Sequence, residues 1–211
     1  MTCDTLSIEL LSDSTFGTGR GSPGEVDVDI VRDDQGLPMI PGKIIHGLLR
    51  DEWFAMESVF PVMTPLAGRV LGVERDLQET SILRIGNARL SPDVLDCCEF
   101  ACGRNNRMSG DLLFLALTGI RSQTAVDHET GVPERTTLRQ SRVSRSDLIF
   151  YAPLTWLNTP TKDEMMLLAR LSMAVRHAGI GRTRGRGHIR CSIDGNPDLT
   201  KQLARLQEAA A

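Results

Sequence analysis

The stretch GIGRTRGRGHIR, residues 179–190, restricts the fold more than any other part of the chain. It contains four glycines and four arginines but no acidic residue. The segment before it, TKDEMMLLARLSMAVRHAG, predicts a helix that Thr161 caps and Gly179 ends, and RGHIRCSID after it predicts a strand. A loop in this position belongs to a folded domain and is not a disordered basic tail. Its glycines indicate a tight backbone path or the close approach of a ligand.

The loop also has the chemistry to hold a polyanion. Glycines expose backbone N–H groups, and arginines present forked donors that match phosphate oxygens. Glycine loops that bind nucleotides run from a strand into a helix, whereas this one runs from a helix into a strand. We therefore predict that it contacts the phosphate backbone of a nucleic acid. The expected contact residues are Gly181, Arg182, Arg184, Gly185, Arg186 and Gly187.

The other strong elements predict an α+β fold. A second amphipathic helix begins near Pro41, and the predicted strands are 5–14, 81–91, 147–157 and 186–194. We expect 26–33 to be a short strand or extended arm, and 92–107 a short helix with a loop. The order strand, helix, strands, helix, strand is ferredoxin-like, of the RNA-recognition type, with one antiparallel sheet and two helices on one face. We predict a single domain over 1–211 with insertions at about 58–80 and 119–145.

Charge is distributed unevenly along the chain. The net charge is −3, yet 174–193 holds five arginines and no acid, while 25–34 holds five acids and one arginine. Aromatic residues make up 4% of the chain, so base stacking cannot be the main RNA contact. No signal segment and no membrane-length apolar run is visible, which predicts a soluble, cytoplasmic protein without membrane contact.

Several motifs resemble the RAMP superfamily, the repeat-associated proteins of CRISPR effectors. The loop at 179–190 is similar to their glycine-rich loop, and LPMIPGKIIHGLLRDEW (37–53) resembles the segment that opens their first helix. STFGTGRGSPGEVDVDIVRDDQGLP (14–38) resembles the glycine loop and aspartate-bearing strand of type III backbone subunits. TAVDHETGVPERTTLRQSRVS (124–144) looks like their protruding thumb hairpin. The resemblance covers most of the chain in order and is weakest at 58–80 and 92–118.

The resemblance implies a backbone subunit of a type III CRISPR effector complex. Such a subunit binds the CRISPR guide RNA together with further copies of itself and other effector subunits, and it binds complementary target RNA. In type III assemblies an aspartate after the first strand cleaves the target with a divalent cation. Laid on this sequence, that aspartate is Asp27, which would hold Mg²⁺ or another divalent cation, with Asp29 as a second candidate. Val28 departs from the family pattern, so the choice between the two aspartates stays open.

Two further groups of residues are predicted to bind RNA. At the start of the second helix, free N–H groups and Lys43 make a phosphate site, joined by Gly42, His46 and Arg50. In the thumb, five arginines outnumber three acids, and we expect Arg135 and Arg139 to contact RNA. The alternatives are a solvated lysine, a packed histidine, and an Arg50 that pairs with its acidic neighbours.

Three functions are alternatives to that of a cleaving backbone subunit. The same backbone role without catalysis, as a scaffold, stays open. A stand-alone guide-processing endoribonuclease would need acid–base residues, and His46, His128 and Tyr151 have no recognisable spacing. A small-ligand enzyme lacks a nucleophile–base pair. We do not expect zinc at Cys97, Cys98 and Cys102, because their spacing is unusual for it and buried small hydrophobes explain them better.

Overall fold

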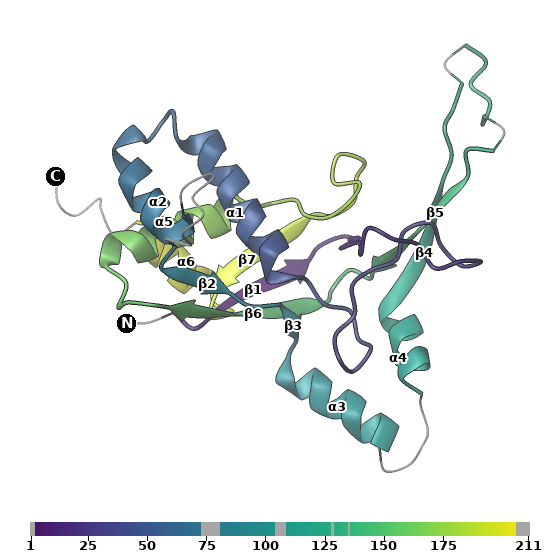
Figure 1. Ribbon diagram of the computed structural model, residues 1–211, viewed down its shortest axis with the longest axis horizontal. Coiled ribbons are helices and arrows are strands. Elements are labelled where there is room, and N and C mark those ends of the chain that lie inside the picture. The colour runs from purple at the N-terminus through teal and green to yellow at the C-terminus, as the bar shows by residue number, and fades with distance from the viewer. Residues whose placement is uncertain (1–2, 73–80, 104–108, 128, 135, 206–211) are drawn as a thin grey trace.

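The computed structural model describes residues 3–72, 81–103, 109–127, 129–134 and 136–205. Its main sheet has the strand order β2-β6-β1-β7, with β3 also paired to β6 and every pair antiparallel (Figure 1). The strands are β1 Thr5–Leu10, β2 Leu83–Ile85, β3 Arg89–Leu90, β6 Ile149–Trp156 and β7 Ile189–Ile193. This is the strand order of a ferredoxin-like sheet, so the predicted α+β, RNA-recognition-type fold is confirmed.

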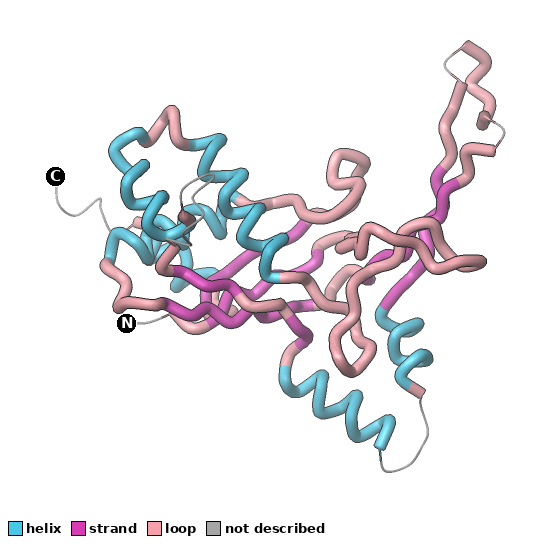
Figure 2. The backbone as a smooth tube through the Cα atoms, viewed as in Figure 1, coloured by secondary structure: helices cyan, strands magenta, loops and turns pink. Residues whose placement is uncertain are grey.

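Helices cover one face of this sheet and enclose the core (Figures 1 and 2). They are α1 Gly42–Met56, α2 Thr64–Leu71 with the short 3₁₀ turn η1 Pro61–Met63 before it, α5 Lys162–Ala174 and α6 Pro197–Ala204. Ile45, Leu49 and Trp53 form the buried stripe of α1 that the sequence predicts. They pack with Leu168 of α5 and Phe150 of β6 in one hydrophobic cluster. Two further helices, α3 Pro92–Gly103 and α4 Gly110–Leu117, lie apart from this layer.

The predicted thumb is a long hairpin that projects from the body of the molecule (Figure 1). Its strands are β4 Thr118–Gln123 and β5 Arg139–Ser144, paired along their whole length. An arm of the chain between β1 and α1 runs along the base of the hairpin, where Ser14 and Val28 bridge to β5. The hairpin base is therefore held by the segment that carries the predicted catalytic aspartates.

The predicted helix over 161–179 starts correctly but ends early. Thr161 and Glu164 form a capping box, and the chain leaves the helix after Ala174. The residues that follow pair with the far side of the glycine loop: the amide of Ile189 donates to Arg176 at 2.9 Å. This pairing continues as a bridge between 177 and 188, so Gly179 lies in the loop and not at the helix end.

Three other elements differ from the sequence-based prediction. The strand over 81–91 is split into β2 and β3, because Ala88 pairs with Ile40 and Asn87 accepts a 3.0 Å hydrogen bond from the amide of Gly42. The segment 26–33 forms isolated bridges and is an extended arm. The helix α4, whose apolar run fits a strand as well as a helix, was not predicted. The predictions for His128, Arg135 and 73–80 concern residues outside the described ranges.

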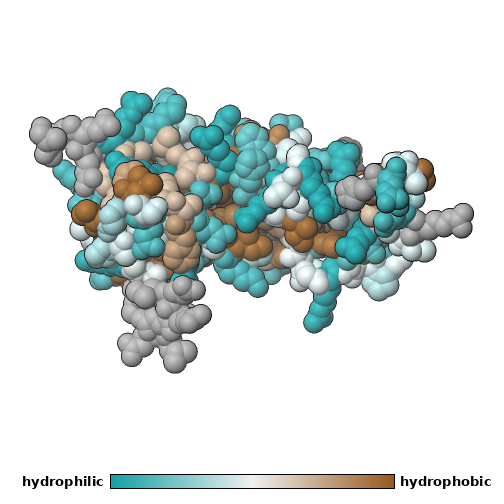
Figure 3. Space-filling view, turned by 90° about the horizontal axis from the view of Figure 1, so that it is seen from above, coloured by the Kyte–Doolittle hydropathy of each residue, from teal (hydrophilic) through white to brown (hydrophobic). Residues whose placement is uncertain are grey.

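The surface above the helices is largely hydrophilic, with hydrophobic residues in small groups (Figure 3). In the described ranges, no helix is both long and apolar enough to cross a membrane.

Candidate nucleic-acid interface

The glycines of the loop are required by its backbone path. Gly179, Gly181, Gly185 and Gly187 all have φ between +73° and +85°, the left-handed region that favours glycine. A Cβ atom at Gly187 would lie 2.1 Å from the carbonyl oxygen of Ala178, and one at Gly179 would lie 2.6 Å from that of Thr15. At these two positions the loop has no room for a side chain. These glycines therefore fix the shape of the loop that carries the arginines.

The loop and the hairpin are both anchored on residues 11–15, a segment after β1 that we call the junction. The carbonyl of Asp13 accepts a 3.0 Å hydrogen bond from the amide of Gly187 in the loop. Its carboxylate accepts from Arg121 of β4 at 2.8 Å and from the amide of Ser146 at 3.1 Å. One residue of the junction thus holds the two features that the sequence predicts to contact RNA. No local pattern in the sequence marks Asp13 for this role.

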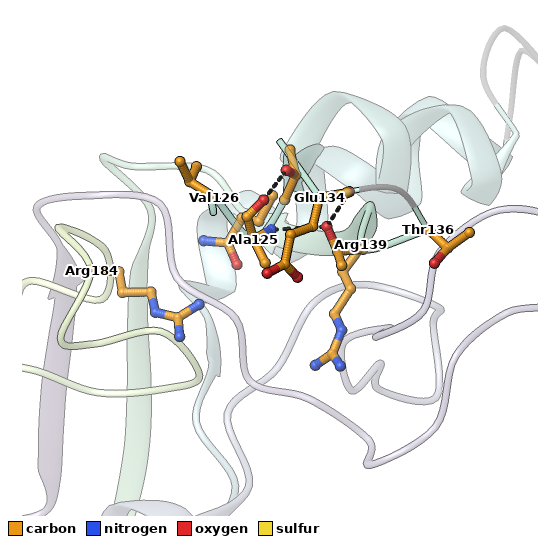
Figure 4. A pocket seen from close by; sticks show the side chains of 9 residues that line it. Ala125, Val126, Glu134, Thr136, Arg139 and Arg184 are labelled. Atoms are coloured by element: carbon orange, nitrogen blue, oxygen red, sulfur yellow. Dashed lines mark hydrogen bonds between the residues drawn. The ribbon is translucent and has the colours of Figure 1, made fainter. Parts of the chain in front are cut away.

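A pocket of about 880 Å³ lies between the loop and the hairpin (Figure 4). Arg184 reaches it from the loop, and Arg139 comes from the hairpin side. Both side chains are exposed, and neither has an ion-pair partner among the residues the structure describes. The rest of the lining is Gln123, Thr124, Ala125, Val126, Glu134, Thr136 and Thr137. Two predicted RNA contacts, far apart in the sequence, therefore share one opening.

The other two loop arginines are arranged differently. Arg182 lies 3.9 Å from the carboxylate of Asp51 on α1, and both groups are largely exposed, so this pair is weak. Arg186 folds back against Gly181, where an added Cβ would lie 3.1 Å from Nη2. Its Nε and Nη1 atoms are enclosed and have no hydrogen-bond partner among the described residues. Because a buried donor without an acceptor is unfavourable, an anionic ligand would stabilise Arg186.

The predicted contacts at the start of α1 divide into exposed and packed residues. Lys43 is exposed and has no ion-pair partner in the part of the chain that is described. Gly42 is buried, and a Cβ there would lie 2.2 Å from the carbonyl oxygen of Ile85, so close packing against β2 explains this glycine. Of these two, only Lys43 presents a donor group at the surface.

His46 and Arg50 lie further along α1. Burial lowers the pKa of His46, and the positive charges of Arg50 and Arg84 lower it further, although a hydrogen bond with the backbone of Leu71 acts in the opposite direction. His46 is therefore neutral at pH 7 and packs toward the end of α2. The guanidinium group of Arg50 lies 5.4 Å from the ring centre of Phe54 on the same helix. Their predicted RNA contacts stay predictions.

Asp27 is an exposed residue of the arm at the base of the hairpin. Its amide donates to the carbonyl of Gln140 at 2.8 Å, and its Oδ2 accepts from the amide of Gln140 at 2.6 Å. It lines an open pocket of about 440 Å³ together with Glu25 and Gln140. Its Oδ1 has no hydrogen-bond partner within the described ranges. Asp27 therefore has a carboxylate oxygen available to an incoming group.

Asp29 is in a different environment, although only one residue separates it from Asp27. It is 8% exposed and accepts hydrogen bonds from Ser22 at 2.7 Å, from the amide of Ile30 at 2.9 Å and from Arg142 at 3.1 Å. Burial alone would raise the pKa of Asp29, but these hydrogen bonds and the charges of Arg142 and Arg32 lower it overall. Asp29 is thus a buried, fully engaged carboxylate.

The described residues contain no group of three or more His, Cys, Asp or Glu side chains placed to hold a metal ion. A magnesium ion needs only one or two protein carboxylates when substrate phosphates and water supply its other ligands. The exposed carboxylate of Asp27 fits that arrangement, whereas Asp29 has no free access. On α3, Cys97 is exposed while Cys98 and Cys102 are half-buried, so the expectation that all three are buried was wrong.

Comparison with known proteins gave a result for structure only. No family model matches the sequence, and no curated protein matches it. A chain of the type III-B Cmr-beta structure in the apo state superposes with a TM-score of 0.68 at 14% identity, over 92% of this chain and 98% of that one. A chain of type III-B Cmr-beta bound to cognate target RNA superposes with a TM-score of 0.69 at 13% identity, over 96% of this chain and 99% of that one. The chain shares their fold. This likeness fits the type III CRISPR resemblance of its motifs.

Proposed function

We propose that this chain is a guide-RNA-binding backbone subunit of a type III CRISPR complex that also binds complementary target RNA. The observation that carries the proposal is the pocket between the loop and the hairpin, which Arg184 and Arg139 enter from two separate elements. Support comes from the fold likeness, which spans 92% or more of the chain and includes a complex described as bound to target RNA.

Phosphate contacts explain this surface better than base contacts do. The pocket is lined by two guanidinium groups that have no ion-pair partner in the described ranges, by four polar hairpin residues, and by Glu134, Ala125 and Val126. None of the described lining residues is aromatic. Arginine forks match phosphate oxygens, and such contacts position a strand without reading its sequence. A guide-binding subunit must accept any guide, so contacts of this kind suit the role. Further copies of the chain would then bind along the same RNA, beside other effector subunits.

For target cleavage we propose Asp27 as the catalytic residue. Its free carboxylate oxygen opens into a pocket at the base of the hairpin, where a strand held by Arg139 would pass. When bound there, a divalent cation would stabilise negative charge on the scissile phosphate. Asp27 would hold that cation, and Gln140 fixes the carboxylate through its amide. The scaffold role without cleavage is the second candidate. The carboxylate next to Asp27 in its described pocket is that of Glu25, and it is already paired with Arg142, so Asp27 lacks a second free carboxylate to share a cation.

The test is a cleavage assay on the assembled complex. The complex is purified with its guide RNA and mixed with labelled complementary RNA in the presence of Mg²⁺, and Asp27→Ala is compared with the unmodified chain. We expect Asp27→Ala to lose cleavage and to retain the guide, because affinity is spread over many phosphate contacts and catalysis depends on one charge. Chelation of the cation should have the same effect.

Each result separates the candidates. Full cleavage by Asp27→Ala would remove this residue from the mechanism. Guide binding without cleavage by the unmodified chain would leave the scaffold role. A purified chain that carries no RNA of defined length would contradict guide binding itself.

A further inference from the structure

We propose that Arg142 is a positioning residue, which holds the acidic arm (residues 22–32) against the hairpin so that Asp27 is placed at the hairpin base. Its effect on cleavage rests on the proposed function, whereas the contact itself can be tested without cleavage. Arg142 and the arm are more than 100 residues apart in the sequence.

The buried guanidinium group of Arg142 is the centre of a charge network whose Glu25 carboxylate is exposed. The residue is 3% exposed on β5. Its Nε lies 3.1 Å from Oδ1 of Asp29, and one terminal nitrogen lies 2.8 Å from Oε2 of Glu25. The two acids precede and follow Asp27 in the arm, two residues away on each side. One side chain therefore holds both flanks of the proposed catalytic residue.

An aromatic ring completes the enclosure. Phe114 of α4 is 2% exposed, and the guanidinium carbon of Arg142 lies 5.2 Å from its ring centre. Arg32, at the end of the arm, lies 3.6 Å from the same ring centre and 3.4 Å from the carboxylate of Asp29. Cations are attracted to the face of an aromatic ring, so the Phe114 ring stabilises the positions of both guanidinium groups. The helix α4 thus joins the arm and the hairpin in one unit.

The backbone contacts show what this network fixes. The amide of Arg142 donates to the carbonyl of Val28 at 2.9 Å, and Gln140 exchanges hydrogen bonds with Asp27. Within the described ranges, the pairing of the arm with β5 amounts to one isolated bridge, between Val28 and Ser141, so the arm lacks the ladder of a regular strand. In extended chains, a shift of one residue turns every side chain to the opposite face. The Arg142 network fixes the register of the arm on both sides of Asp27, and together with the Gln140 hydrogen bonds it keeps Asp27 turned toward its pocket.

The same network gives Asp29 a structural role. Its carboxylate is taken up by Arg142, Arg32, Ser22 and the amide of Ile30, so it serves to hold the arm and does not bind the cation. Removal of Arg142 would leave a buried carboxylate without its main counter-charge, which the fold tolerates poorly. The arm would then move to expose Asp29 to water, and Asp27 would move with it.

The first test is kinetic. The complex is assembled with Arg142→Met, Arg142→Lys or Asp29→Asn, and the cleavage rate at saturating target is measured over a series of Mg²⁺ concentrations. A displacement of about 1 Å at a reacting group costs about 100-fold in rate, which is the loss expected for Arg142→Met. Arg142→Lys should recover part of the rate. Because Asp27 would hold the cation, its displacement should raise the Mg²⁺ concentration for half-maximal rate to a similar extent in Arg142→Met and Asp29→Asn. A rise in that concentration for Asp29→Asn far beyond the rise for Arg142→Met would make Asp29 a metal ligand and overturn the assignment.

The matched control is Arg89→Met. Arg89 pairs with Asp34 near the end of the same arm at 2.9 Å, but both side chains are exposed. Exposed ion pairs contribute little, so this variant should cleave like the unmodified chain. A similar loss in Arg89→Met would show that any contact to this part of the chain matters, and the special role of Arg142 would be refuted.

The second test does not depend on cleavage. Hydrogen exchange of the amides in 22–32 is measured on the RNA-free chain, with the amides of α5 as an internal reference for correct folding. We expect faster exchange in the arm for Arg142→Met and Asp29→Asn, with α5 unchanged. Unchanged exchange in the arm would refute the positioning role of Arg142 even if cleavage falls. Faster exchange in the arm, together with an unmodified complex that does not cleave, would refute only the catalytic role of Asp27. If Arg142→Met fails to fold, the other two variants decide.

Discussion

Removal of the two charges that enter the pocket should lower the salt dependence of RNA binding by a calculable amount. We consider Arg139→Gln/Arg184→Gln, which removes both guanidinium groups and leaves polar side chains in place. For single-stranded nucleic acid, each lost phosphate contact lowers the slope of log K against log salt concentration by about 0.7. The two arginines enter from different elements and share no described ion-pair partner, so their contributions should add to about 1.4.

This slope difference is easily measured. Between 50 and 200 mM salt the concentration rises about fourfold, so the unmodified chain should lose about seven times more affinity than the double variant. The assay is fluorescence anisotropy with two labelled single-stranded RNAs of unrelated sequence. Both RNAs should give the same result, because phosphate contacts do not read bases.

The control variant is Lys162→Gln. Lys162 is an exposed cation at the start of α5, at the end of that helix opposite the glycine loop. The helix spans about 20 Å, which exceeds the Debye length of about 10 Å at 0.1 M salt. Its slope should therefore equal that of the unmodified chain. Equal slopes for the double variant and the unmodified chain would refute the assignment of this pocket to RNA.

Three shorter predictions concern the loop, the helix cap and the arm. Gly187→Ala should lower the melting temperature and weaken RNA binding, because left-handed backbone costs about 1–2 kcal/mol for alanine and the new Cβ would meet the Ala178 carbonyl. Thr161→Ala removes the oxygen that accepts from the Glu164 amide and should cost about 1 kcal/mol in urea unfolding. Because the pKa of Asp29 lies below its ordinary 3.8, its charge stabilises the fold fully above that pH and this stabilisation is lost as the pH falls through the lower value. The stability advantage over Asp29→Asn, measured by urea unfolding from pH 7 to pH 2, should therefore be constant near neutrality and shrink in acid.

The sequence predicts well those parts whose stabilising contacts are local. The apolar stripe of α1, the Thr161 cap and the alternation in β1 and β6 are all set by residues a few positions apart. The glycine loop could also be located, since its composition fits neither a helix nor a strand. These features suffice for the order of elements, and hence for the fold class.

The sequence does not predict contacts between distant segments. The end of α5 depends on the pairing of Arg176 with Ile189 across the loop, so the helix ends before Gly179, the residue that the sequence predicts as its end. The different environments of Asp27 and Asp29 depend on Arg142, which lies on β5 without any motif. In the sequence, the family resemblance alone places Asp27 before Asp29, and the different surroundings of the two carboxylates are visible only in the folded chain.

The junction has a consequence for how such a chain can change over evolutionary time. Asp13 bonds the loop through its carbonyl and the hairpin through its carboxylate. An insertion of one residue at 11–15 would displace both partners in the same step, so this segment should keep a constant length among descendants. The hairpin tip between Val126 and Glu134 lies beyond the pocket lining and is not bonded to the junction in the described ranges, so its length can change without altering this spacing. The length of the hairpin can therefore vary in this fold, whereas the spacing between the loop and the hairpin should stay constant.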